Sequence, residues 1–252
     1  MNAMNKSGYM VEAKELKLCY GSELILQDIT FEVRGGECLV IMGASGCGKS
    51  TLLRSMTGLL KPVCGNVKFS NGYLWGEGDI PDQDILSNFG VLFQGGALWS
   101  SMNILENVSL PLQTYSKLDC QEIEEVASYK LSLVGLSGCE YRYPAQLSGG
   151  MQKRAGLARA MSMDPDILFL DEPSAGLDPI NSSQLDELIV ELKNSLGLTF
   201  IVVTHELKSI FEIADNAIFL SSQSKSLLDH GRPADLQSVS KHYEVRSFLS
   251  RS

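Results

Sequence analysis

The chain has 252 residues, 44% of them hydrophobic, which is enough for one large α/β domain or two small ones with a substantial core. Its formal net charge of -9 argues against a nucleic-acid partner, because binding without sequence specificity depends on a basic surface. Its six cysteines include no CxxC pair, and we expect free thiols in a reducing compartment rather than a disulfide framework.

The N-terminal segment shows no sign of export. Its first eight residues lack the apolar core of a signal peptide, and no apolar run in the chain approaches the ~18 residues that a membrane span needs. We therefore expect a cytoplasmic protein that meets a membrane through a partner.

Two strands are predicted near the N-terminus, over 11–18 and 29–33, because apolar side chains alternate in both segments. Tyr20 lies between them, directly before a glycine. An aromatic side chain in this position is more often an ordinary hairpin residue, although its flat face is also suited to stacking on an adenine ring.

A glycine-rich loop follows an apolar strand predicted over 38–42 and precedes a helix predicted over 51–56. This strand, loop and helix order is what a phosphate-binding loop requires. The loop consists of Gly43, Ala44, Ser45, Gly46, Cys47, Gly48, Lys49, Ser50 and Thr51. Its glycines allow main-chain N–H groups to turn inward around an oxyanion, and the helix adds the positive end of its dipole. Lys49 is predicted to reach the β- and γ-phosphates, and the Ser50 hydroxyl to ligate Mg²⁺.

The next segments predict a strand over 65–69, a surface loop over 71–84 and a short apolar strand over 89–93. The last of these strands ends at Gln94. In open α/β sheets ligands gather at the carboxyl edge, although a glutamine there is by itself as consistent with a solvated loop.

Residues 95–163 have the spacing of a helical insertion, with helices predicted over 104–112 and 119–133 and a third after 147–152. Ser148 is a candidate N-cap of the third helix, followed by Gly149 and Gly150. This helix start is a second candidate anion site, or simply a capped helix.

A buried strand predicted over 167–170 ends in two adjacent carboxylates, Asp171 and Glu172. Neighbouring side chains of a strand point in different directions, so the two can have different roles. We expect Asp171 in the second shell of Mg²⁺ and Glu172 as the base that orients and deprotonates water. Further on, a strand predicted over 199–204 ends at His205, so polar groups again follow an apolar strand and a shared site is favoured.

These motifs together resemble the nucleotide-binding subunit of an ATP-binding-cassette (ABC) transporter over nearly the whole chain. The residues that carry the resemblance are the loop at 43–51, Gln94, the signature segment 147–152, Asp171 with Glu172, Asp178 and His205. The resemblance implies an α/β fold, namely a P-loop NTPase core with an antiparallel β subdomain and a helical insertion. It further implies a single domain over 10–250, with the helical subdomain at about 95–163 and a C-terminal tail at about 240–252.

The resemblance also implies a head-to-tail homodimer with ATP and Mg²⁺ between the subunits. Each ATP would lie on Lys49, Ser50 and Gln94 of one subunit, under the signature residues Ser148, Gly149 and Gly150 of the other. By the same resemblance, Tyr20 stacks on adenine and the Asp178 loop crosses the interface. The implied catalytic residues are Glu172 as base, His205 as γ-phosphate switch, Gln94 and Lys49. The implied metal site consists of Ser50, Gln94 and Asp171.

Shorter sequence segments are similar to the ATPases of Mla/Mce-type lipid transport systems, for example 94–99, 151–155, 174–180 and 245–249. This similarity implies an ATPase on the cytoplasmic face of a bacterial inner membrane, attached peripherally, that drives phospholipid transport between membranes. The implied partners are integral-membrane permease subunits and a lipid-binding Mce-domain protein, with room for a small regulatory subunit. In that branch the C-terminal tail can embrace the neighbouring ATPase.

Three other functions compete with phospholipid transport. An ATPase of a small-solute transporter would use the same chemistry, but the 95–112 region, which faces the permease in this family, favours the lipid branch. A nucleic-acid-associated ABC protein is disfavoured by the single cassette, the absence of a heptad run and the acidic balance. A nucleotide-gated scaffold that signals without transport is left open.

Overall fold

A six-stranded, mostly parallel sheet forms the centre of the fold in the computed structural model, which describes residues 9–75 and 80–250. The strand order is β10-β9-β3-β8-β7-β6, and β10 runs antiparallel to β9 while the other neighbours are parallel. These strands are β3 (Cys38–Gly43), β6 (Phe89–Leu92), β7 (Ile167–Asp171), β8 (Thr199–Val203), β9 (Asn216–Ser221) and β10 (Ser226–Gly231). Every residue of β3 and β8 is buried, as expected for strands covered on both faces.

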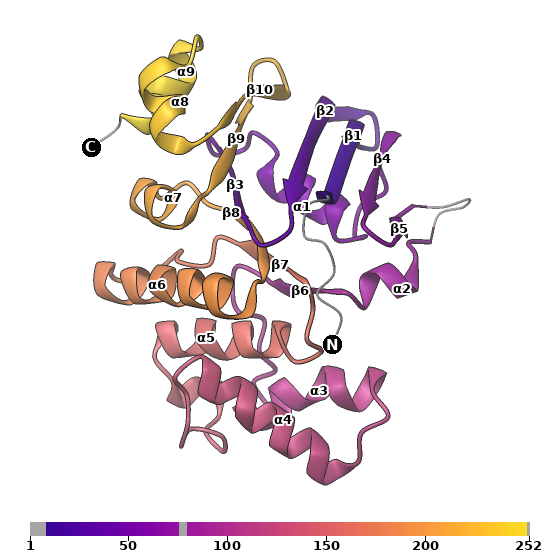
Figure 1. The fold of residues 1–252 in the computed structure, drawn as a ribbon, viewed down its shortest axis with the longest axis vertical. Coiled ribbons are helices and arrows are strands. Elements are labelled where there is room, and N and C mark those ends of the chain that lie inside the picture. Colours follow the sequence, from indigo (N-terminus) through magenta and orange to yellow (C-terminus); the bar gives the residue numbers. More distant parts are fainter. Residues whose placement is uncertain (1–8, 76–79, 251–252) are drawn as a thin grey trace.

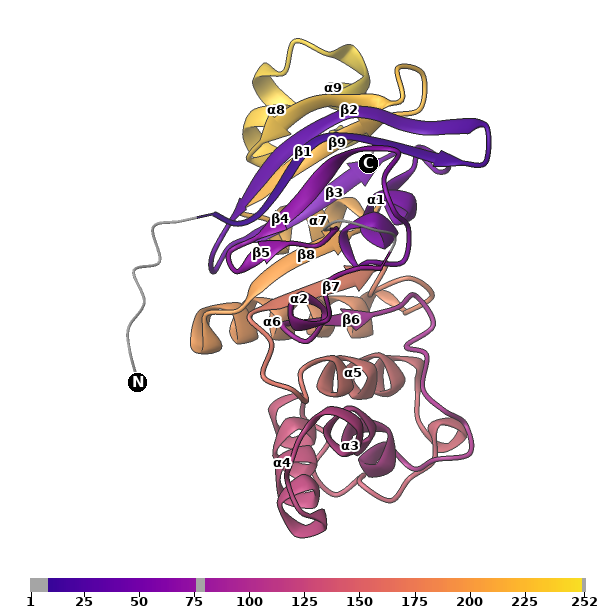
Figure 2. The ribbon, with the colours of Figure 1, turned by 90° about the vertical axis from the view of Figure 1, so that its right-hand side faces the viewer.

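A second sheet of four strands, in the order β2-β1-β4-β5, lies against one face of the central sheet (Figure 2). Its strands are β1 (Tyr9–Tyr20), β2 (Glu23–Arg34), β4 (Cys64–Phe69) and β5 (Gly72–Tyr73), all paired antiparallel. The two N-terminal strands are longer than predicted. The register between them shifts around Glu15, which has a φ of 51°, and such a bulge interrupts the alternation from which strands are predicted.

The prediction of a surface loop over 71–84 was wrong in part. The segment contains β5 and the start of the short helix α2 (Gln83–Leu86), while residues 76–79 lie outside the described part of the chain. Residues 1–8, for which the sequence predicts no signal peptide, also lie outside it. The Asp82 carboxylate accepts hydrogen bonds from the main-chain N–H groups of Asp84 at 2.9 Å and Ile85 at 3.2 Å. An acidic residue typical of loops is therefore the N-cap of this helix.

The central sheet separates two hydrophobic cores. On the side of the antiparallel sheet, residues such as Leu39 and Ile41 of β3 pack with helix α1 (Lys49–Met56). On the other side, Val40 and Met42 of the same strand share a core with the helices within 104–133, 149–160 and 179–249. The alternation of one strand thus supplies both cores.

Three helices of the 95–163 segment gather at one end of the molecule (Figure 1). They are α3 (Ile104–Tyr115), α4 (Cys120–Leu133) and α5 (Gly149–Ala160), with a short 3₁₀ helix at Pro144–Gln146. Capping boxes formed by Asn103 with Glu106 and by Asp119 with Glu122 mark where the first two begin. The three predicted helices are confirmed, and α3 continues past Pro111, near which the prediction ended it.

The C-terminal part of the chain adds four helices, α6 (Pro179–Leu196), α7 (Leu207–Ile213), α8 (Pro233–Val239) and α9 (Tyr243–Leu249). The apolar residues at 185, 188, 189, 192 and 196 lie on one helix face, so the sequence predicts the first of these helices. The other three, and β9 and β10, were not predicted. In α9, Val245, Phe248 and Leu249 are buried in their own chain, and the Phe248 ring lies edge-on to Phe219 with centroids 5.4 Å apart. An embrace of a neighbouring subunit by this tail would therefore have to use its outer side, where Tyr243 is 77% exposed.

None of the helices within residues 9–75 and 80–250 combines the length and the apolar character required to cross a bilayer.

Helix α5 packs so closely on β6 that a side chain at Gly90 would collide with the main-chain carbonyl oxygen of Ala160. We expect Gly90→Ala to lower the free energy of unfolding by about 3 kcal/mol, since both clashing groups are tied into regular structure. Gly95→Ala is the matched control, because a side chain there meets nothing within 4 Å. Urea unfolding followed by circular dichroism measures both, and equal stabilities would contradict the packing described here.

Candidate functional site

The polar residues singled out in the sequence lie at one edge of the central sheet. Because β3, β6, β7 and β8 are parallel, their carboxyl ends share that edge, and the phosphate loop, Gln94, the Asp171-Glu172 pair and His205 each follow one of them. This is the edge at which open α/β sheets bind ligands.

The phosphate loop is a tight turn between β3 and α1. Gly48 is the N-cap of α1 with a φ of 102°, a conformation that glycine adopts readily and other residues do not. A side chain at Gly43 would collide with the carbonyl oxygen of Leu220 and with the Cys47 sulfur. Lys49 is only 7% exposed, and its ammonium donates to the carbonyl oxygens of Gly43 and Ala44, at 3.0 Å each. The lysine charge is thus held inside the loop.

Ser50 and Asp171 form a polar pair beside the loop. The Ser50 hydroxyl donates to Asp171 Oδ1 at 3.1 Å. Burial raises the pKa of the Asp171 carboxyl, and the hydrogen bond from Ser50 opposes that rise. A hydroxyl and a carboxylate oxygen in contact are the donor types that Mg²⁺ prefers, so this pair fits the ion.

Glu172 is the centre of a cluster with Gln94 and His205. Gln94 Nε2 donates to Glu172 Oε2 at 3.0 Å, and His205 Nδ1 lies 3.0 Å from Glu172 Oε1. The φ of Glu172 is 47°, in the left-handed region that non-glycine residues occupy only when their surroundings impose it. Each carboxylate oxygen of Glu172 therefore has its own partner, and the carboxylate group has a defined orientation.

A cleft of about 610 Å³ joins the loop to this cluster. It is lined by Gly43, Ala44, Ser45, Lys49, Glu172, His205, Leu207 and Phe248. Sequence reasoning missed the last two as lining residues. Leu207 could have been found from its place two residues after His205, whereas nothing local to Phe248 indicates that α9 folds back to this cleft.

The other predicted residues lie outside the cleft lining. Tyr20 ends β1, its ring is exposed, and its hydroxyl accepts a hydrogen bond from the Arg54 guanidinium at 3.0 Å. Ser148 caps α5 by accepting from the Met151 N–H at 3.3 Å. Asp178 likewise caps α6.

The glycines that follow Ser148 face a neighbouring element rather than the cleft. A side chain at Gly149 would contact Leu177, and one at Gly150 would press on Asn181 of α6. The signature segment is therefore separate from the loop of its own chain.

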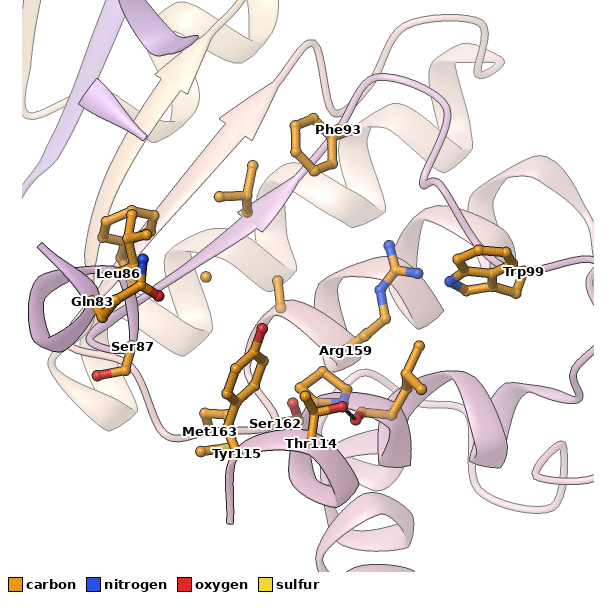
Figure 3. Close-up of a pocket in the computed structure, with 16 residues that line it drawn as sticks. Gln83, Leu86, Ser87, Phe93, Trp99, Thr114, Tyr115, Arg159, Ser162 and Met163 are labelled. Carbon is orange, nitrogen blue, oxygen red and sulfur yellow. Dashed lines mark hydrogen bonds between the residues drawn. The ribbon is translucent and has the colours of Figure 1, made fainter. Parts of the chain in front are cut away.

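A second pocket, of about 570 Å³, lies between β6 and the helical end of the molecule (Figure 3). Exposed aromatic side chains at its rim are Phe93, Trp99 and Tyr115, and Arg159 of α5 lies between Trp99 and the tyrosine. An accessible apolar pocket with one cation is suited to a partner's helix or loop.

Comparison with known proteins agrees with this architecture. Among curated proteins, the chain is 39% identical to the probable ribonucleotide transport ATP-binding protein mkl of Mycobacterium leprae, over 96% of this chain and 69% of that one. It is 36% identical to the intermembrane phospholipid transport system ATP-binding protein MlaF of Escherichia coli K12, over 95% and 88%.

Solved structures show the same fold. CbiO1 of Clostridium perfringens, part of the transporter complex cbiONQ, superposes with a TM-score of 0.82 at 29% identity, over 92% of this chain and 91% of that one. The cassette MJ0796, a dimer bound to ADP and Pi, gives 0.77 at 30% identity, over 88% and 98%. The model of the ABC transporter family matches residues 26–175. The chain therefore belongs to the ABC transporter family, as an ATP-binding subunit that hydrolyses ATP.

Proposed function

We propose that this ATPase drives the transport of phospholipid between bacterial membranes, from the cytoplasmic face of an inner-membrane complex. The hydrogen-bonded cluster of Gln94, Glu172 and His205 beside the Lys49 loop is the observation that carries the hydrolytic part. The similarity to MlaF, which spans 88% of that protein, supports the phospholipid part.

Hydrolysis in this site depends on Glu172 as general base. Its two oxygens are engaged by Gln94 and His205, so the carboxylate is oriented to take a proton from water. The oxygen of that water attacks the γ-phosphorus while the bond from phosphorus to the ADP oxygen breaks, which yields ADP and phosphate.

Groups suited to bind the nucleotide and Mg²⁺ lie at the same edge of the central sheet. The loop amides and Lys49 would hold the phosphates, and Tyr20 would stack on the adenine. Ser50, Gln94 and Asp171 would hold Mg²⁺, which supplies positive charge to the phosphate oxygens. His205 would sense the γ-phosphate.

Two copies of the chain are needed to complete each site. Ser148, Gly149 and Gly150 do not line the cleft of their own chain, yet Ser148 and Gly149 are exposed at a helix start suited to an anion. In a head-to-tail dimer they would close over the ATP of the other copy, with Asp178 at the interface. The dimeric state of MJ0796 with ADP and Pi supports this arrangement.

The second pocket is the proposed docking surface for a membrane permease. It is built from α2, β6, α3 and α5, between the central sheet and the helical part at 95–163. A motion of a permease segment there would act on both parts of the single domain at 10–250. An Mce-domain protein that binds lipid would complete the transporter, with a small regulatory subunit as a further partner.

Ribonucleotide transport is the second candidate function, because the mkl relative carries that description at slightly higher identity. The cargo is selected by other chains of a transporter, so the two functions share the ATPase chemistry described here. The two functions differ in which proteins and lipids remain bound to the assembled complex when it is purified.

We expect Glu172→Gln to keep ATP affinity and to lower turnover at least about a hundredfold, because a carboxamide can orient water but cannot accept its proton. The assay is phosphate release by the assembled complex together with ATP binding measured by calorimetry. Turnover close to the wild-type value would refute the role of Glu172 as base.

We expect Lys49→Ala to weaken ATP binding itself, by about tenfold or more, because it removes the one lysine charge held inside the loop. The same calorimetry measures the dissociation constant. Cys47→Ser in the same loop is the control, because this position contributes mainly its backbone. Normal affinity in Lys49→Ala would contradict the assignment of the loop.

Purification of the subunit from its own membranes in mild detergent tests the cargo. We expect mass spectrometry to find a permease and an Mce-domain protein with bound phospholipid. A permease with a solute-binding protein and no retained lipid would favour ribonucleotide transport instead. Trp99→Ala should release the permease, whereas Tyr129→Ala, an equally exposed aromatic of α4 outside the pocket, should retain it.

A further inference from the structure

A buried lysine of α5 joins the two chain segments that form the hydrolytic cluster. Lys153 is 6% exposed, and its ammonium donates to the main-chain carbonyl of Gln94 and, at 3.4 Å, to that of Glu172. Gln94 follows β6, Glu172 follows β7, and Lys153 belongs to the helical end of the molecule. One side chain thus ties the backbone of both site residues to a third element.

An arginine two turns along α5 holds the same loop at its other end. The Arg159 guanidinium donates to the carbonyl of Ala97 at 2.7 Å and to that of Gly96 at 2.9 Å. Gly156 lies between the two cations, and a side chain there would come within 3.0 Å of the Gly96 carbonyl oxygen. Positions 153, 156 and 159 share one face of the helix, so the whole loop 94–97 lies along it.

The anchored segments contain backbone conformations that need support. Ala97 and Glu172 have φ values of 49° and 47°, in the left-handed region that non-glycine residues occupy only when their surroundings hold them there. Both residues have their own carbonyl bound by a cation of α5.

The lysine charge is compensated by its surroundings. Burial lowers the pKa of Lys153, whereas the nearby carboxylates of Glu172, Asp171 and Glu206 favour its charged form. Since a buried ammonium needs partners, the two carbonyls and the carboxylates together keep it in place.

We propose that Lys153 and Arg159 are positioning residues for ATP hydrolysis, which fix the backbone of loop 94–97 and of Glu172 to α5. This inference rests on the proposed roles of Gln94 and Glu172. Arg159 also lines the proposed docking pocket beside Trp99 (Figure 3), so displacement of the helix by a docked permease moves Gln94 with it.

The test compares Lys153→Met with Lys130→Met in the full-length subunit assembled with its permease. Lys130 is the matched control, because it is also a buried lysine of the helical end, 3% exposed, but it pairs with Asp164 away from the site. We expect Lys153→Met to lower kcat by about tenfold with KM changed less than about threefold, and Lys130→Met to leave both within about twofold. Lys153→Arg, which keeps a cation able to reach a carbonyl, should recover most of kcat.

Hydrogen exchange of the nucleotide-free protein supplies a readout independent of turnover. The Gly96 amide donates to the Phe93 carbonyl at 2.8 Å, and its exchange should accelerate in Lys153→Met but not in Lys130→Met. If Lys153→Met does not fold, Arg159→Lys replaces it, since it keeps the charge but loses the double contact to Gly96 and Ala97.

Two results would overturn the proposal, namely unchanged exchange at Gly96 or a loss of kcat no larger than in Lys130→Met. Glu172→Gln, measured in parallel, distinguishes failure of the proposed Lys153 anchor from failure of the proposed role of Glu172 as base. If Glu172→Gln abolishes turnover while Lys153→Met lowers kcat no more than Lys130→Met does, the proposed anchoring by Lys153 alone is wrong. If Glu172→Gln retains turnover, the base assignment fails first.

Discussion

The pairing of β7 with β6 on one side and β8 on the other is the constraint on which the site depends. Parallel pairing brings the three carboxyl ends to one edge, and there Gln94, Glu172 and His205 meet within hydrogen-bond distance although they are far apart in sequence. Strand β3, which pairs with the other side of β8, places the Lys49 loop at the same edge. A shift of one residue in any of these registers would turn the polar residue at the strand end away from its partners.

Much of this arrangement is visible in the sequence. The apolar strands before Gly43, Gln94, Asp171 and His205 are short, and each ends at a sharp boundary between apolar and polar residues; the structure has strands at all four places. The helices at 104–115 and 120–133 are equally plain, because Asn103 and Asp119 cap them with a glutamate three residues later. Signals of this kind depend only on residues that are neighbours in the sequence, so they can be recognised without knowledge of the fold.

What the sequence did not show depends on contacts between distant residues. The strands β9 and β10 complete the sheet through long-range pairing, and α9 closes the cleft with Phe248 because the surface beneath it, around Phe219, is apolar. The contacts of Lys153 with carbonyls 59 and 19 residues away could not be inferred either. A lysine in an amphipathic helix is ordinarily exposed, and only the packing of α5 against the loop after β6 buries this one.

Helix α5 connects the parts of the proposed mechanism because it is short and rigid. Its 12 residues correspond to roughly 18 Å of helix at 1.5 Å per residue. Its first turn carries Ser148, Gly149 and Gly150, its middle holds the hydrolytic cluster through Lys153, and its last turn reaches the docking pocket through Arg159. A helix of this length cannot bend between those points without losing main-chain hydrogen bonds, so a partner that moves one end moves the other. In the proposed complex, closure of the dimer at the first turn and docking of a permease at the last would therefore both act on the Glu172 carboxylate.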